Sequence, residues 1–120
     1  MILVDTSIWI DHLRSGEEPL IDLLNSSQIL AHPFVIGELA CGNLRKRDEV
    51  LRLLNDLPQA LVASHEEVLH FIERNKLMGQ GVGYIDAHLL ASTALTHTAL
   101  IWTRDKRLQK IARKLKLASD

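Results

Sequence analysis

The sequence predicts an α/β fold of three layers, with helices on both faces of a central parallel sheet of four strands. Short apolar runs typical of buried strands alternate with longer segments of helical periodicity, which favours right-handed crossovers between parallel strands. The first run, Ile2 to Val4, contains no polar residue and ends at Asp5, as expected for a strand buried on both faces. With 120 residues, 47% of them apolar, we expect a single domain over residues 1–120 with its own core.

Strands are expected at residues 1–4, 28–31, 60–63 and 99–103, and helices at 8–14, 20–25, 34–42, 48–57, 64–78, 84–97 and over the basic C-terminal segment. Pro19 and Pro33 open helices, where a missing N–H costs nothing, and Pro58 ends one. Ser64 followed by Glu67 is typical of a capping box at a helix start. The apolar residues that this helix is expected to turn inward are Val68, Leu69, Phe71 and Ile72.

Composition excludes several classes of protein. No apolar run approaches the ~20 residues of a membrane-spanning helix, and Asp5 interrupts the first run too early for a signal peptide. The single cysteine, Cys41, cannot form an internal disulfide, which favours a reducing, cytoplasmic setting. The glycine-rich loop at residues 79–83 lacks the Gly-Lys-Ser/Thr ending of a phosphate-binding P-loop, so we expect no nucleotide site there.

Four acidic residues stand where a parallel sheet gathers functional groups. Asp5 and Asp105 each follow an expected strand, and Glu38 and Asp86 lie in the opening turns of helices. All four can therefore meet at the carboxyl edge of the sheet, where α/β proteins bind ligands. A lone Asp at such a position also serves as a helix cap, and both interpretations stay open for Asp5.

A cluster of four carboxylates requires a compensating cation. Two carboxylates about 4 Å apart repel by roughly 4 kcal/mol at an effective dielectric constant near 20. Oxygen ligands select a hard ion, Mg²⁺ or Mn²⁺, whereas the six histidines show no spacing typical of metal ligands. The pattern predicts a Mg²⁺ or Mn²⁺ site whose ligands are Asp5, Glu38, Asp86 and Asp105.

Four short motifs carry a family resemblance: Val4-Asp5-Thr6-Ser7, Ile36-Gly37-Glu38-Leu39, Tyr84-Ile85-Asp86-Ala87 and Trp102-Thr103-Arg104-Asp105. In this order and spacing the chain resembles the PIN domain, particularly the VapC-like ribonuclease toxins of type II toxin–antitoxin modules. The resemblance implies that the four acids line a metal-dependent nuclease site, supported by the hydroxyls of Thr6, Ser7 and Thr103. It also implies a fifth strand at the sheet edge, which residues 117–120 leave short or absent.

The chemistry that this resemblance implies is endonucleolytic hydrolysis of RNA by a metal-activated water. Either Glu38 or Asp105 then binds metal through water or orients the attacking water. An Asp-phosphorylating enzyme or receiver domain is the first alternative, but the chain lacks both the Asp-x-Asp motif and the strand-end Lys that it requires. A PIN-fold RNA-processing nuclease that is not a toxin is a second alternative. An inactive PIN-fold binding module is a third, which the presence of all four acids disfavours.

Basic residues cluster near the C-terminus although the net charge is −1. Seven of the 14 Lys and Arg residues lie between Arg104 and Lys116, opposed there only by Asp105. Such clustering is typical of phosphate contact, and a solvated helix face with cations near its C-terminus is the alternative. The residues that we expect to contact RNA are Arg104, Lys106, Arg107 and Lys110.

Apolar residues are plentiful for a chain of this length, and part of them is expected on an interaction surface. Trp9 and Ile10 lie near the expected active edge, and a leucine-rich stretch runs from Leu51 to Leu57. The alternative is that all of them belong to the core. The resemblance favours partners: a homodimer, and an antitoxin protein whose C-terminal segment covers a groove near Trp9 and the acids.

Overall fold

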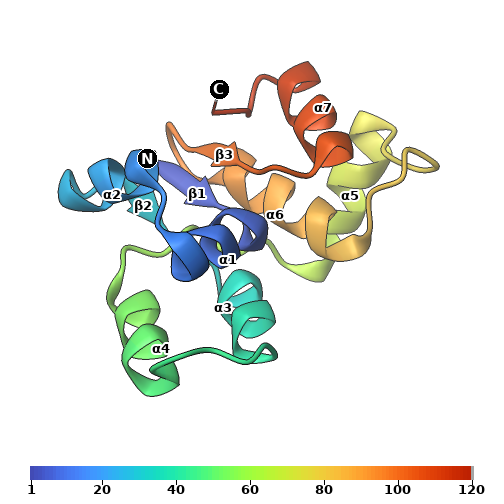
Figure 1. The fold of residues 1–120 in the computed structure, drawn as a ribbon. Helices are drawn as coiled ribbons and strands as arrows, with labels where there is room; N and C mark the ends of the chain where they lie inside the picture. Colours follow the sequence, from blue (N-terminus) through green and yellow to red (C-terminus); the bar gives the residue numbers. More distant parts are fainter. Residues whose placement is uncertain (120) are drawn as a thin grey trace.

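The computed structural model describes residues 1–119 and has a parallel sheet at its centre (Figure 1). β1 (Ile2–Val4) lies between β2 (Ile29–Leu30) and β3 (Leu100–Trp102). Ile2 stands opposite Ile29 on one side and opposite Leu100 on the other. The apolar sequence of β1 explains its central place, because a strand with neighbours on both sides exposes little to water. The α/β class and the parallel sheet are thus confirmed.

Residues 60–63 do not form the regular strand expected from the sequence. A single parallel bridge joins Gln59 to Ala31 beside β2. Farther along, the amide of Ala63 donates a hydrogen bond of 3.0 Å to the hydroxyl of Ser92 on a neighbouring helix. The prediction of a strand over these residues was wrong. The amide of Ala60 still donates to the carbonyl of Ala31 at 2.9 Å, but the amides of Leu61 and Ala63 donate to the hydroxyls of Thr96 and Ser92 instead of to a neighbouring strand.

The expected fifth strand is reduced to one parallel bridge, between Ala118 and Ile101. The amide of Ile101 donates to the carbonyl of Leu117 at 2.7 Å, and the amide of Ser119 donates to the carbonyl of Ile101 at 2.8 Å. The last residue of the chain, Asp120, lies outside the described residues. In residues 1–119 the sheet therefore has three strands, rather than four or five, with a single bridge at each edge.

Each expected helix is present. They are α1 (Thr6–Ser15), α2 (Glu18–Asn25), α3 (Pro33–Ala40), α4 (Arg47–Asp56), α5 (His65–Asn75), α6 (Tyr84–Leu95) and α7 (Lys106–Lys114). The predicted capping box of Ser64 and Glu67 is confirmed. The prediction for Leu69 was wrong, because this side chain is 49% exposed.

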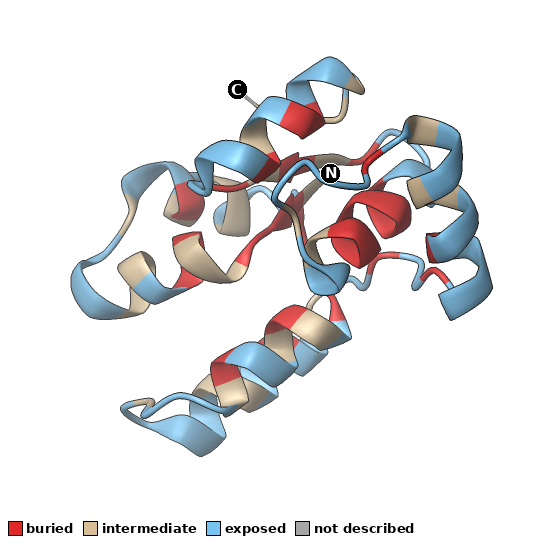
Figure 2. Ribbon diagram, turned by 90° about the vertical axis from the view of Figure 1, so that its right-hand side faces the viewer, coloured by how far each residue is buried: buried red, intermediate tan, exposed pale blue. Residues whose placement is uncertain are grey.

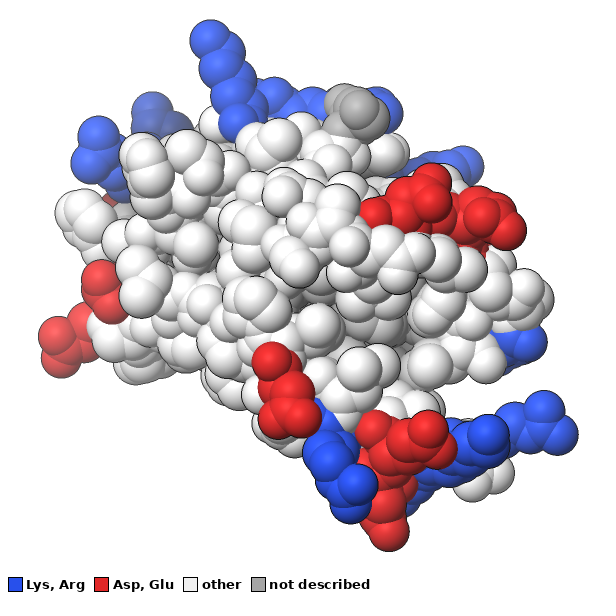
Figure 3. Space-filling model, turned by 90° about the vertical axis from the view of Figure 1, so that its left-hand side faces the viewer, with Lys and Arg blue, Asp and Glu red and all other residues white. Residues whose placement is uncertain are grey.

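The core surrounds β1 and α6 (Figure 2). Residues 87–93 of α6 are all buried, which is possible because small side chains on this helix allow α5 and β3 to approach it closely. α3 and α4 instead extend away from the sheet as an arm (Figure 1). Lys and Arg alternate there with Asp and Glu, at the lower end of the molecule (Figure 3).

Among the described residues, no helix has the length and apolar character that crossing a membrane would require.

Candidate active site

Asp5 stands directly after β1 and is only 7% exposed. Its Oδ1 atom accepts a hydrogen bond of 2.8 Å from the amide of Thr6, so Asp5 caps α1. Its Oδ2 atom accepts a bond of 2.7 Å from the hydroxyl of Thr103 and a longer one, 3.5 Å, from the hydroxyl of Ser7. The helix-cap interpretation of Asp5 is confirmed, and its second oxygen contacts the hydroxyls of Thr103 and Ser7.

The hydroxyl of Thr103 joins Asp5 to Asp105. It donates to Asp5, and it accepts a hydrogen bond of 3.1 Å from the amide of Asp105. Asp105 caps α7 in turn, because its Oδ1 atom accepts from the amide of Leu108 at 3.0 Å. The adjacent parallel strands β1 and β3 thus bring two acids that are 100 positions apart in sequence to one edge of the sheet.

Glu38 reaches the same edge from α3. The hydroxyl of Thr6 donates a hydrogen bond of 2.7 Å to its Oε1 atom, and the amide of the same threonine donates to Asp5. Thr6 therefore joins Asp5 to Glu38 as Thr103 joins Asp5 to Asp105. Each hydroxyl expected to support the site, those of Thr6, Ser7 and Thr103, contacts one of these acids.

Asp86 lies in the first turn of α6 and is half-buried. Burial raises the pKa of its carboxyl above the ordinary value of 3.8, and the negative charges of the three other acids raise the pKa further. A hydrogen bond from the backbone of Gly83 acts in the opposite direction. The charges of Asp5, Asp105 and Glu38 all act on Asp86, so the four acids belong to one electrostatic cluster.

The donor set of this cluster fits a hard divalent cation. Carboxylate and hydroxyl oxygens are the ligands that Mg²⁺ and Mn²⁺ prefer. Within residues 1–119, no three His, Cys, Asp or Glu side chains already stand in a metal-ligating arrangement. A cation placed between the four acids would offset the repulsion that raises the pKa of Asp86.

Comparison with known proteins decides the family. A family model of the PIN domain matches residues 2–114. This chain belongs to the PIN domain family. It is similar to Ribonuclease VapC32 from two strains of Mycobacterium tuberculosis, with 51% identity over 109 residues that cover 91% of this chain and 88% of the relative. The chain is therefore a PIN domain ribonuclease of the VapC family.

The basic residues of this PIN domain occupy two different environments. The guanidinium of Arg104 is held by Asp11 of α1 and by Glu17, whose Oε1 atom lies 2.5 Å from Nη2. Lys106 and Lys110 are exposed on α7. These two lysines therefore offer charge to solvent near the acids, whereas Arg104 is engaged within the protein.

Arg107 packs across the glycine-rich loop that precedes α6. Gly81 has φ of +81°, and a Cβ atom added there would stand 2.8 Å from Cδ of Arg107. The left-handed backbone favours glycine at this position, and a larger residue would also push the flexible side chain of Arg107 aside. This loop lies between α5 and α6. It brings the start of α6, with Asp86, beside the start of α7, with Asp105.

Sequence reasoning missed several residues that position the site. Glu17 and Asp11 pair with Arg104, and nothing local in the sequence marks either acid as its partner. His32 caps α3, the helix that carries Glu38, because its Nδ1 atom accepts from the amide of Phe34 at 3.0 Å. A His before a Pro-opened helix is a weak signal of such a cap.

A groove of about 450 Å³ runs between α1 and α3 beside the acid cluster. Its lining residues are Ile10, Leu13, Arg14, Glu38, Leu39, Gly42, Asn43, Leu44 and Arg45. A second hollow shares Leu13 and Arg45 with it and continues along α4 to Leu53. The expected contribution of Trp9 to such a groove was wrong, because Trp9 is 1% exposed and its place is taken by Ile10, at 42%.

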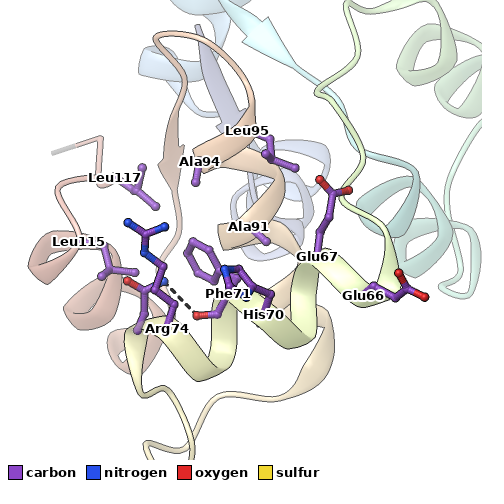
Figure 4. A pocket seen from close by; sticks show the side chains of 11 residues that line it. Glu66, Glu67, His70, Phe71, Arg74, Ala91, Ala94, Leu95, Leu115 and Leu117 are labelled. Carbon is purple, nitrogen blue, oxygen red and sulfur yellow. Dashed lines mark hydrogen bonds between the residues drawn. The ribbon is translucent and has the colours of Figure 1, made fainter.

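A further pocket of about 550 Å³ lies between α5, α6 and the segment after α7 (Figure 4). Apolar side chains, among them Phe71, Leu95 and Leu117, form much of its wall. Glu66 and Glu67 stand at one end and Arg74 at the other (Figure 4). Asp5, Glu38, Asp86 and Asp105 do not line it.

Proposed function

We propose that this PIN domain is a metal-dependent endoribonuclease, the toxin of a toxin–antitoxin pair, whose site consists of Asp5, Glu38, Asp86 and Asp105. The observation that carries the proposal is a set of contacts around Asp5. Thr6 donates its amide to Asp5 and its hydroxyl to Glu38, and the hydroxyl of Thr103 donates to Asp5 and accepts from the backbone amide of Asp105. The name of its relative, Ribonuclease VapC32, supports RNA as the substrate. The protein is proposed to act as a single domain.

The acids would hold one or more Mg²⁺ or Mn²⁺ ions between the ends of β1, β3 and the starts of α3 and α6. Such an ion, when bound, supplies a water of lowered pKa and stabilises negative charge on the phosphate. Asp5 and Asp105 are anchored by capping bonds and by Thr103, which fixes their carboxylates before substrate arrives. Glu38 is exposed, and its carboxylate accepts a hydrogen bond from the hydroxyl of Thr6. An exposed carboxylate of this kind is suited to orienting the attacking water.

The test is cleavage of RNA by the purified protein with Mg²⁺ or Mn²⁺, with and without a chelator. Internal cleavage that needs the metal is the expected result. RNA binding without cleavage would indicate an inactive PIN-fold binding module instead. Cleavage in chelator would contradict the role proposed for the acids.

The exposed cations of α7 are proposed to contact RNA phosphates. Replacement of Lys106, Arg107 and Lys110 by Gln is expected to weaken RNA binding equally for all sequences. Binding releases fewer counterions when a phosphate contact is lost. The magnitude of the slope of log K against log salt should therefore fall by about 0.7 per lost contact for single-stranded RNA. Binding titrations between low and moderate salt measure this, with Lys114→Gln at the other end of α7 as the control. An unchanged slope would assign these residues to a solvated helix face.

The groove between α1, α3 and α4 is proposed to receive the antitoxin. Its apolar floor suits an apolar segment, and a basic antitoxin side chain that reached Glu38 would pair with its carboxylate. Leu53→Glu is expected to weaken the complex at least tenfold and leave RNA cleavage unchanged, because Leu53 is 51% exposed on the groove side. Leu69→Glu is the matched control, since Leu69 is 49% exposed on α5.

Co-expression with the small open reading frame next to this gene supplies the partner for that measurement. Inhibition of cleavage in the wild-type complex is expected. A stable complex that still cleaves RNA would mean that the partner is not an active-site inhibitor, and the absence of any such partner would favour an RNA-processing nuclease that is not a toxin.

The protein is also proposed to be a homodimer that uses the pocket beside α5. A two-fold axis would place two α5 helices antiparallel, with Glu66 of one copy facing Arg74 of the other, a self-complementary arrangement. Light scattering is expected to give a dimer for the wild type, a monomer for Arg74→Glu, and a dimer again when that variant is mixed with Glu66→Arg. A monomeric wild type at tens of micromolar would refute the dimer.

A further inference from the structure

Arg104 stands between two residues of the nuclease site. Thr103 precedes it and donates to Asp5, and Asp105 follows it and caps α7. A contact that holds Arg104 in place therefore also restricts the positions of Thr103 and Asp105, since the three residues are consecutive in the backbone.

Both ends of Arg104 are attached to the segment around α1. Its amide donates a hydrogen bond of 3.3 Å to the hydroxyl of Ser7. Its guanidinium uses Nη1 for Asp11 and Nη2 for Glu17. The Glu17 side chain is 21% exposed and the Arg104 side chain 43%. A planar guanidinium that engages two carboxylates with two different nitrogens has a defined orientation.

We propose that Arg104 is a positioning residue of the nuclease site, whose ion pairs with Asp11 and Glu17 hold Thr103 and Asp105 against Asp5. The proposal rests on the nuclease function proposed above. It replaces the expectation that Arg104 contacts RNA.

The charges around Arg104 argue against a phosphate contact. Two carboxylates engage one guanidinium, so the group of three carries a net negative charge. A phosphate would therefore approach a guanidinium whose positive charge two carboxylates already offset. The exposed Lys106 and Lys110 carry no such cost.

Removal of the acid partners separates the two roles, because they predict changes of opposite sign. If Arg104 positions the site, Glu17→Gln and Asp11→Asn should loosen the turn formed by residues 103–105. We then expect kcat to fall about 10-fold or more and Mn²⁺ to bind about 10-fold more weakly, as for other residues that orient metal ligands. If Arg104 contacts RNA, the same substitutions free its charge, and RNA should bind more tightly with a steeper salt dependence.

Arg104 itself is tested with two substitutions. Arg104→Gln is expected to lower kcat and Mn²⁺ affinity as the acid variants do, with KM and the salt dependence of RNA binding unchanged. Arg104→Lys keeps the charge but cannot present two nitrogens to two acids, so it should restore only part of kcat. Glu18→Gln is the matched control, since Glu18 is an exposed acid next to Glu17, and it should behave as the wild type.

Mn²⁺ affinity is measured without RNA, by titration of the free ion, so this result does not depend on cleavage. Circular dichroism at the assay temperature checks that each variant is folded. If Asp11→Asn or Glu17→Gln does not fold, the other of these two variants provides the test. Wild-type Mn²⁺ affinity and kcat in Asp11→Asn and Glu17→Gln would overturn the inference and leave the nuclease function intact. A wild type that neither binds Mn²⁺ nor cleaves RNA would overturn the nuclease function instead.

Discussion

Asp5→Asn and Asp86→Asn are each expected to reduce metal-dependent RNA cleavage by more than about 100-fold while the protein stays folded. Loss of a group that only orients a metal ligand costs about 10–100-fold, so loss of a ligand should cost more. Cleavage rates at saturating Mg²⁺ or Mn²⁺ measure this effect. Asp22→Asn removes an exposed acid of α2 and is expected to leave the rate unchanged. Full activity in both site variants would refute the proposed nuclease site.

Thermal melting in chelator should distinguish the two variants. Asp86 is half-buried and repelled by three acids, so Asp86→Asn is expected to raise the melting temperature of the metal-free protein. Asp5→Asn loses acceptor capacity toward Thr103 and a negative charge at the start of α1, which offsets the relief of repulsion. A clear loss of stability in both variants would contradict clustering.

Melting with added Mn²⁺ completes the comparison. An ion that binds the folded state stabilises it by mass action, so the wild type should melt at a higher temperature as Mn²⁺ increases. Both site variants should show little of this increase, whereas Asp22→Asn should show all of it. This measurement reports on the metal site without RNA.

The sequence was informative about the site because its signals are local. A strand that ends on an acid and is followed by hydroxyl residues marks Asp5 with Thr6 and Ser7, and a second such strand end marks Thr103 and Asp105. Adjacent parallel strands place their carboxyl ends together. The structure brings these residues into direct contact, and the hydroxyls of Thr6, Ser7 and Thr103 each contact the carboxylate of one acid.

What the sequence could not predict are contacts between distant residues with no common pattern. Arg104 pairs with Asp11 and Glu17 across 93 and 87 positions, and no periodicity relates them. The sequence pattern also did not predict the burial of Trp9, because the periodicity of a short amphipathic helix does not show which part of the protein covers each of its side chains. Residues 60–63 look like a strand by composition, and they differ only because side chains of α6 accept from their backbone.

His32 is another such contact, and it has a consequence for stability. This side chain is fully buried at the start of α3. Its Nδ1 atom accepts from the amide of Phe34, so the proton lies on Nε2, which is 3.0 Å from the hydroxyl of Ser92. That hydroxyl also accepts from the amide of Ala63, and it therefore turns its own hydrogen toward His88. The chain of bonds is satisfied only when His32 is neutral.

The folded protein should therefore lose stability in mild acid. Burial, and next the neighbouring His88, lower the pKa of His32 from 6.5 to about 4. Between these two values the unfolded chain binds a proton that the folded protein does not, so the free energy of unfolding falls as the pH falls. The contribution of His32 between pH 7 and pH 5 is about 2 kcal/mol, because each pH unit in this window costs up to about 1.4 kcal/mol.

Urea unfolding of the wild type and of His32→Asn at pH 7 and pH 5 tests this contribution. Asn is a good helix cap that does not titrate in this range, so the variant, whatever its stability at pH 7, should lose about 2 kcal/mol less than the wild type on going to pH 5. His97→Asn, which removes an exposed histidine after α6, should keep the pH dependence of the wild type. Equal losses in the wild type and His32→Asn would show that the pKa of His32 is the same in the folded and the unfolded protein, and that acid acts on the protein elsewhere.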